Sequence, residues 1–182
     1  MEVNGPVIET ARLRLRPPRE ADFESMCVLY ADETAARFIG GVKEPAVVWR
    51  MLAQIMGHWA MRGWGFFAIE ERATGRYAGW AGPWFPHGWP APEVGWSLLP
   101  AFQGRGYATE AAAAAIDHAF GTLGWDRVVH LIDAGNDPSK AVARRLGSSD
   151  TGQDAEIAGF GVIVDVWGQS RADWRARSGG TV

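Results

Sequence analysis

Apolar and polar positions along the chain follow two periods, which separate the expected strands from the expected helices. Near the start, leucines and arginines alternate over 12–16, which predicts a half-buried strand that two following prolines end. Apolar residues at helical spacing then predict a helix over 22–30. A second helix is expected to begin at Pro45, because proline is favoured at the first helical position, and to continue to about residue 61.

The rest of the chain continues to alternate between strands and helices. Residues 82–92 contain four prolines and two glycines and are expected to form a loop. The other expected elements are strands over 66–70, 76–81, 93–99 and 127–132, helices over 107–120 and 139–146, and two short strands around Gly159 within 156–167. The order of strand, two helices, three strands, helix, strand, helix and two strands predicts an α/β domain built on a mixed sheet.

The composition fits one globular domain and narrows the class of function. Of the 182 residues, 47% are apolar and 21% are charged, which is enough to bury a sizeable core. The net charge is −3 and no Lys/Arg block stands out, so a nucleic-acid partner is not expected. A mildly acidic surface suits an acceptor that carries positive charge.

Cysteine usage and the apolar segments predict a cytoplasmic protein that works without a metal. Cys27 is the only cysteine, so neither an intramolecular disulfide nor a thiolate metal site can form. The first residues lack the basic and apolar regions of a signal peptide. The apolar run 111–115 is far shorter than the roughly 20 residues that a membrane span needs, so no membrane partner is expected.

Tryptophan is unusually frequent, with ten residues that gather mainly between Trp49 and Trp96. Such a cluster can pack in the core, or it can line a groove or an interface. The loop over 82–92 adds aromatic residues at a place where contact with solvent is expected. Exposed tryptophan is also compatible with a homodimer.

The chemically informative segment joins an expected strand to the alanine-rich helix. It holds two glycines, Gly104 and Gly106, which can adopt positive φ and leave room for a ligand. The first amides of the helix have no internal partners and its dipole favours negative charge, so the segment can cradle a phosphate, with Arg105 at the rim. A tight turn before a packed helix explains the same glycines without a ligand. The dinucleotide fingerprint fails at Thr109, and no P-loop sequence occurs.

Four segments together resemble the GNAT N-acetyltransferase superfamily, in the order in which that family carries them. The segment Gln103-x-x-Gly106-x-Ala108 resembles the family's [R/Q]-x-x-G-x-[G/A] signature for the pyrophosphate of acyl-CoA. The other three are Glu93-Val94-Gly95-Trp96, the segment from Asn136 and Ser139 through Val142 to Arg145-Leu146-Gly147, and the opening 9–16, which is similar to the RimJ/RimL-like branch. The resemblance covers 7–174 and implies one N-acetyltransferase domain, with flexible termini over 1–6 and 175–182.

The resemblance implies the GNAT acyl-CoA N-acyltransferase fold, a mixed, mostly antiparallel sheet of about seven strands flanked by about four helices. It implies an enzyme that uses acetyl-CoA to acetylate a primary amine of a protein N-terminus, a small molecule or an antibiotic. In the family, the fourth and fifth strands splay apart, and the fourth strand and the segment after it bind the pantetheine arm and the pyrophosphate. The corresponding cofactor-binding residues are Trp96, Ser97, Leu98, Leu99, Gln103, Gly104, Arg105, Gly106, Tyr107, Ala108, Thr109, Asn136 and Ser139.

An amine must lose a proton before it attacks a thioester, so a base is expected near the cofactor. Glu93 is the first candidate because its strand leads into the expected site, although a solvated carboxylate at a strand edge is the alternative. His87 and Glu70 are weaker candidates. Many relatives carry a Tyr as general acid where this chain has Ala143, and Ser139 could instead donate a hydrogen bond to the leaving thiolate.

The aromatic residues of the loop over 82–92 are expected to line the groove for the acceptor: Trp84, Phe85, His87 and Trp89. Ser148 stands where an aromatic residue is usual in the family, and Asn136 alone would be an ordinary turn residue. Two other classes stay open. A non-catalytic acyl-CoA-binding or regulatory module agrees with Ala143, whereas a nucleotide-binding domain is disfavoured by Thr109. The sequence leaves the acceptor amine unidentified.

Overall fold

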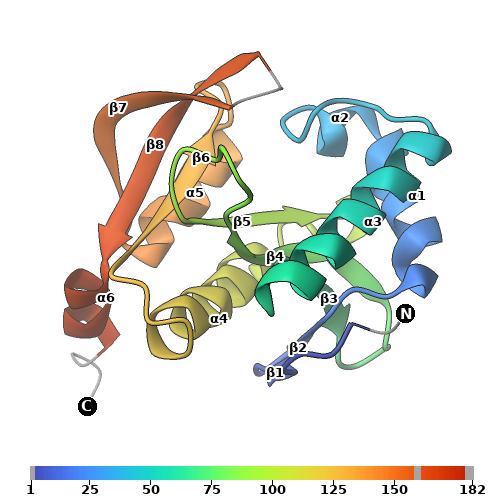
Figure 1. Cartoon of the computed structure of the whole chain (residues 1–182), viewed down its shortest axis with the longest axis horizontal. Helices are drawn as coiled ribbons and strands as arrows, with labels where there is room; N and C mark the ends of the chain where they lie inside the picture. The colour runs from blue at the N-terminus through green and yellow to red at the C-terminus, as the bar shows by residue number, and fades with distance from the viewer. Residues whose placement is uncertain (1–2, 158–160, 179–182) are drawn as a thin grey trace.

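The chain forms an eight-stranded sheet with helices on both faces, in a computed structural model that describes residues 3–157 and 161–178 (Figure 1). The strands lie in the order β1-β2-β3-β4-β5-β6-β8-β7, and every neighbouring pair is antiparallel except β5 and β6. The strands are β1 (Ile8–Glu9), β2 (Leu13–Arg16), β3 (Phe67–Glu71), β4 (Tyr77–Trp84), β5 (Glu93–Leu98), β6 (Arg127–Ile132), β7 (Ser149–Ile157) and β8 (Val162–Ser170). The helices are α1 (Phe23–Ala31), α2 (Glu33–Ala36), α3 (Pro45–Arg62), α4 (Tyr107–Gly121), α5 (Asp137–Leu146) and α6 (Arg171–Ser178), with 3-10 turns at Glu20–Asp22 and Pro100–Phe102. The expected mixed, mostly antiparallel α/β sheet is confirmed, with more strands and helices than expected.

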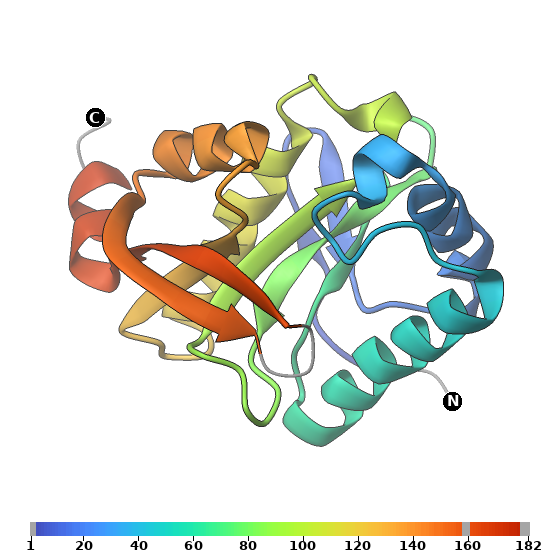
Figure 2. The same ribbon diagram turned by 90° about the horizontal axis from the view of Figure 1, so that it is seen from above.

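One face of the sheet is covered by α1 and α3 (Figure 2). In the register of the central strands, Ala68 lies opposite Trp80, and Trp80 lies opposite Ser97, so the three side chains share this face. Met26 of α1 and Leu52 of α3 line a small pocket together with Ala68 and Trp80. The two helices are therefore anchored on the face that carries Trp80.

The opposite face is covered by α4. Phe67, Ala81 and Trp96 share this face, and His118 of α4 lies edge-on to the Phe67 ring, with the ring centroids 5.5 Å apart. Because alanine has a small side chain, an alanine-rich helix can approach a sheet closely. The alanines of α4 with no exposed surface are Ala111, Ala112, Ala115 and Ala119.

The prediction of a loop over 82–92 was wrong at the start of that range, because β4 continues through Trp84. Gly82, Pro83 and Trp84 pair with residues of β5. Proline lacks an N–H and normally breaks a central strand. Here the backbone of Pro83 faces away from β5, and its neighbour on the other side, β3, begins only at Phe67, which pairs with Ala81. The missing donor therefore costs no ladder hydrogen bond.

The C-terminal third also differs from the expectation. β7 and β8 are nine-residue strands rather than two short ones, and Gly159 lies outside the described residues. The helix α6 follows β8 directly and spans Arg171–Ser178. β1, α2 and α6 were not predicted, and each is short. No helix among residues 3–157 and 161–178 combines the length and apolar character needed to cross a bilayer.

Candidate active site

β5 and β6 separate after their first shared residue pair. In the described residues the two parallel strands pair only at Glu93 and Val129, where the N–H of Val129 donates to the carbonyl of Pro92 at 3.0 Å. Over the part of the chain that the structure describes, β5 then continues to Leu98 with β4 as its only ladder partner. One edge of β5 therefore lies open along a gap that widens from Glu93.

Strand geometry determines which backbone groups face this gap. The N–H of Leu99 donates to the carbonyl of Ala78 at 2.9 Å, so alternate residues of β5 point toward β4. The backbone groups of Val94, Trp96 and Leu98 then point toward β6. The carbonyls of Val94 and Leu98 accept side-chain hydrogen bonds, from His130 at 2.6 Å and from Gln103 at 3.0 Å. Among the described residues the N–H and C=O of Trp96 make no hydrogen bond with β6 or with a side chain, so both are left for a ligand.

The segment after β5 forms the expected glycine-containing turn. Gly104 and Gly106 have φ of +71° and +78°, in the left-handed region that favours glycine. Gly106 is the N-cap of α4 and makes no side-chain capping hydrogen bond. The first amides of a helix have no partner within the helix, so those of α4 face outward as donors. The turn therefore has the geometry of an anion site at a helix N-terminus.

The turn is held by residues from the start of the chain. Arg12 donates from Nη1 to the carbonyl of Arg105 at 2.8 Å and forms an ion pair with Glu110 of α4 at 2.7 Å. Thr10 donates to the other oxygen of Glu110 at 2.6 Å. Through these contacts the opening segment, which lies about a hundred residues earlier in the sequence, packs against the turn. Sequence reasoning did not assign Arg12 or Glu110 to the site, although 9–16 was among the matching segments.

The side chain of Arg105 is held in place by an ion pair with a second acidic residue, Glu71. Its Nη2 lies 2.7 Å from Oε1 of Glu71, which also accepts from the hydroxyl of Tyr107 at 2.6 Å. The Tyr107 hydroxyl and Arg105 hold the pKa of Glu71 below its ordinary value. The side chain of Arg105 remains 47% exposed, so it can still face an anion at the rim.

Glu93 lies where the two strands part. Its side chain shares the face of Trp84, on the side of α1 and α3, and the residue is 8% exposed. Oε2 accepts from Nε1 of Trp89 at 2.8 Å, and Oε1 accepts from the N–H of Leu131 at 3.3 Å. Burial raises the pKa of Glu93 to about 7, although both donors oppose the shift. Glu93 is thus a buried carboxyl that titrates near neutral pH, not a solvated one.

The expected acceptor residues occupy different environments. Trp84 is buried and lies between the rings of His58 and Phe66, at centroid distances of 4.4 and 4.6 Å. It therefore belongs to the aromatic core beneath the loop. Trp89 contacts Glu93, and His87 is exposed.

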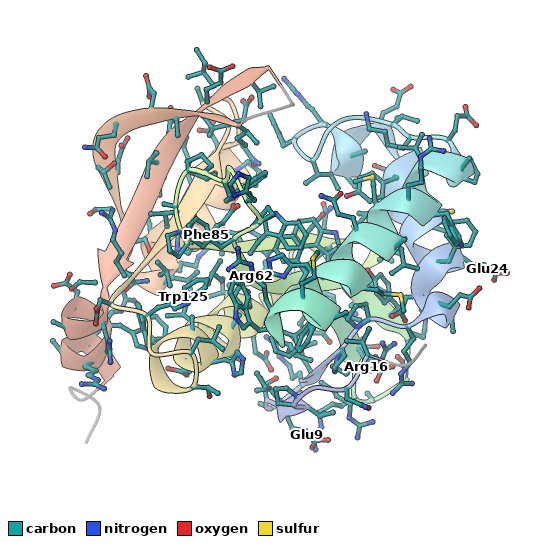
Figure 3. All side chains as sticks on the ribbon, viewed as in Figure 1. Glu9, Arg16, Glu24, Arg62, Phe85 and Trp125 are labelled. Carbon is teal, nitrogen blue, oxygen red and sulfur yellow. The ribbon has the colours of Figure 1, made fainter. Side chains whose placement is uncertain are left out.

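Phe85 is half-buried at the end of α3. The guanidinium of Arg62 lies 5.7 Å from the centroid of its ring, and Figure 3 places the two side chains side by side near Trp125. Glu70, a weaker base candidate, forms an ion pair with Arg16 at 2.6 Å on β3. The structure thus places Trp84 and Trp89 beside Glu93, whereas Glu70 lies away from Glu93 in its ion pair with Arg16.

Asn136 and Ser139 form the N-terminus of α5. The side-chain oxygen of Asn136 accepts from the N–H of Ser139 at 3.2 Å, so Asn136 caps the helix. Within residues 3–157 and 161–178 its amide nitrogen and the Ser139 hydroxyl have no hydrogen-bond partner, so both can bind a ligand. Ala143 has no exposed surface and packs in a cluster with Ile132 and Trp167. The position of the family's usual Tyr is therefore part of the core here.

Comparisons with known proteins agree with this geometry. Residues 12–149 match the family model described as Acetyltransferase (GNAT) domain. An acetyltransferase structure from Agrobacterium tumefaciens str. C58 is 30% identical with a TM-score of 0.83, covering 94% of this chain and 98% of that chain. The Bacillus subtilis (strain 168) protein YkkB is 28% identical over 146 residues, covering 76% of this chain and 82% of YkkB. RimL, ribosomal L7/L12 alpha-N-protein acetyltransferase in complex with coenzyme A, shares the fold at 19% identity and a TM-score of 0.72, covering 91% and 98% of the two chains.

Proposed function

The chain belongs to the GNAT acetyltransferase family, and from this premise we propose that it transfers the acetyl group of acetyl-CoA to a primary amine. The open edge of β5 carries the proposal. The N–H and C=O of Trp96 face the gap, and β5 leads directly into the turn in which Gly106 is the N-cap of α4 and leaves the first amides of the helix uncapped. The open strand edge and the anion site therefore lie next to each other on one surface.

The residues present fit coenzyme A at both ends of this surface. An amide-bearing arm can pair with an open strand edge as an added strand does, and Trp96 offers one donor and one acceptor for it. The diphosphate requires close approach to backbone amides. A Cβ on Gly106 would lie 3.4 Å from Nη2 of Arg12, so a side chain there would fill the space beside the amides. We assign the diphosphate to the turn 103–109 and the pantetheine arm to 96–99, with Asn136 and Ser139 beside the arm.

Glu93 is the base in this proposal. Acetyl-CoA supplies the thioester whose carbonyl carbon the amine attacks, and the C–S bond breaks to release the thiolate. With a pKa of about 7, about half of the Glu93 carboxyl groups are ionised at neutral pH and can accept the proton of the amine, directly or through water. The N–H groups on the open edge of β5 are the donors available to the thioester oxygen. The Ser139 hydroxyl can donate a hydrogen bond to the thiolate, which needs only weak acid assistance because an ordinary thiol pKa is about 8.5.

The acceptor approaches from the face that α1 and α3 cover, since the Glu93 side chain points there. Trp89 and Phe85 lie at the edge of this region. We place the chain in the RimJ/RimL-like branch, as a cytoplasmic enzyme with its domain over 7–174. RimL is described as an alpha-N-protein acetyltransferase of ribosomal L7/L12. A protein N-terminal amine is therefore the first acceptor to test, before small-molecule amines.

The test compares coenzyme binding and turnover in matched variants. Gly106→Trp introduces bulk where the diphosphate is proposed to lie, and Gly124→Trp carries the same strain at a positive φ of +72° with nothing within 4 Å of its Cβ. Isothermal titration calorimetry with coenzyme A should give no binding for Gly106→Trp and wild-type affinity for Gly124→Trp. Release of coenzyme A from acetyl-CoA is then followed with peptide and small-molecule amines.

The outcomes separate the proposal from its alternatives. Wild-type affinity in Gly106→Trp would place the coenzyme elsewhere and overturn the assignment. Tight binding of acetyl-CoA without turnover on any amine would favour a non-catalytic acyl-CoA-binding module, with which the buried Ala143 agrees. Turnover on peptide amines alone would support a protein N-terminus as the acceptor.

A further inference from the structure

Two backbone groups at the point where β5 and β6 part are each bonded to a side chain. The carbonyl of Val94 accepts from Nδ1 of His130 at 2.6 Å. The N–H of Leu131 donates to Oε1 of Glu93 at 3.3 Å. Because the parallel ladder is in register at Glu93 and Val129, its next bond would join the N–H of Leu131 to the carbonyl of Val94. The two groups that would extend the ladder are thus occupied by side chains instead.

The orientation of the His130 ring follows from its partners. A carbonyl can only accept, so Nδ1 of His130 carries the proton and Nε2 is the acceptor. The hydroxyl of Ser148 then donates to Nε2 at 2.9 Å, and the side-chain amide of Gln169 donates to Ser148 at 2.9 Å. His130 is 1% exposed, and burial lowers its pKa to about 4, so the ring is neutral in this arrangement. Ser148, which stands where an aromatic residue is usual in the family, therefore links His130 to Gln169 by hydrogen bonds.

The same ring also supports the next residue of the open edge. The centroids of the His130 and Trp96 rings are 4.8 Å apart, on the face of the sheet that α4 covers. One further ladder step would pair the N–H of Trp96 with the carbonyl of Leu131. That step would remove the backbone donor of Trp96 that faces the gap midway along β5.

We propose that His130 is a positioning residue that holds β5 and β6 apart, so that the N–H and C=O of Trp96 stay available to the coenzyme. The inference rests on the proposed function, because the value of an open edge depends on coenzyme A binding there. His130 occupies the Val94 carbonyl and fills the space beside Trp96, and Ser148 and Gln169 keep the ring in the donating orientation. His130 itself touches neither substrate nor reacting atoms.

The test uses a pair of variants with similar shape and opposite hydrogen-bonding capacity. His130→Asn keeps an N–H donor at the δ position, whereas His130→Leu places methyl groups there. In the ligand-free protein, the Trp96 amide should exchange with solvent about tenfold more slowly in His130→Leu than in the wild type, because the ladder gains a step. His130→Asn should exchange like the wild type.

Coenzyme binding gives a second readout. The Kd of His130→Leu for coenzyme A should rise about tenfold, which corresponds to about 1.4 kcal/mol, while His130→Asn stays within about threefold of the wild type. The Kd for 3′-phospho-ADP, which lacks the pantetheine arm, should be the same in all three proteins.

Each result bears on a different claim. Equal Trp96 exchange in the two variants would overturn the role of His130, whether or not the wild type binds coenzyme A. Equal loss of coenzyme affinity in both variants would also overturn it, since the donor would then be irrelevant. Failure of the wild type to bind coenzyme A, together with the expected difference in exchange, would instead overturn the proposed function and leave the role of His130 between the strands intact.

Discussion

Trp89 controls the basicity of Glu93, because its indole N–H is one of two donors to that carboxylate. Nε1 of Trp89 lies 2.8 Å from Oε2 of Glu93, and the N–H of Leu131 lies 3.3 Å from Oε1. Burial raises the pKa of Glu93 to about 7 and both donors oppose this rise. Trp89→Phe keeps an aromatic ring edge-on to Trp84 and removes the indole donor. The pKa of Glu93 is therefore expected to rise further.

The size of the effect follows from the strength of the lost bond. A hydrogen bond to an ionised group contributes about 1.5–3 kcal/mol and one pKa unit corresponds to about 1.36 kcal/mol, so the pKa should rise by at least about one unit. At pH 7 the ionised fraction of Glu93 would fall from about one half to about one tenth, which lowers kcat/KM about fivefold. At pH 5.5 the loss should approach about tenfold, and at pH 9 it should shrink to about 10%.

The assay measures kcat/KM for acetyl transfer between pH 5.5 and about 9.5 with a single amine acceptor. Dividing the Trp89→Phe profile by the wild-type profile removes the ionisation of the amine, which is the same in both. Trp125→Phe is the matched control, because Trp125 packs edge-on to Trp64 in the same aromatic cluster. Its ratio should be independent of pH. A ratio for Trp89→Phe that is equally flat would refute the reasoning, since the indole would then act through packing alone.

Two further predictions concern stability. The pKa of Glu93 is raised in the folded state, so its favourable contribution to stability is complete below the unfolded pKa of about 4.5 and is lost as pH rises through about 7. Between pH 4 and pH 8 the unfolding free energy of the wild type should therefore fall by about 3 kcal/mol more than that of Glu93→Gln. Equal changes of the two proteins in urea titrations would contradict the burial of Glu93. Arg16 donates two hydrogen bonds to Asp22, at 2.6 and 2.8 Å, and a third to Glu70. Arg16→Met removes the cation that pairs with both carboxylates and should lower the unfolding free energy by about 3–5 kcal/mol, whereas a loss below about 1 kcal/mol would mean that the network adds little.

The turn before α4 could be predicted from the sequence because its determinants are local. Two glycines at positive φ, an alanine-rich run and the end of a strand follow one another directly, and each acts within a few residues. The helix over Pro45–Arg62 was equally accessible, since Pro45 begins it and Gly63 at φ +75° ends it. By contrast, no periodic pattern predicts β7, because its side chains are mostly exposed on both faces. This strand forms by pairing with β8.

Trp84 illustrates why a local rule can fail. The density of proline and glycine around it predicts a loop, but pairing with β5 extends the strand through this residue. Burial between His58 and Phe66 then makes it part of the core. Neither partner lies near Trp84 in the sequence, so only the folded chain reveals its environment.

By itself, the sequence determined the order of the longer elements, the glycine turn that can hold a diphosphate and the candidate base. Tertiary structure alone decided the separation of β5 from β6, because that separation depends on contacts such as Val94 with His130, which are 36 residues apart. It also decided the pKa of Glu93, which reflects burial and donors from two other segments, Trp89 and Leu131. Local conformation follows from nearby residues, whereas desolvation and the pairing of strand edges arise only when distant segments meet.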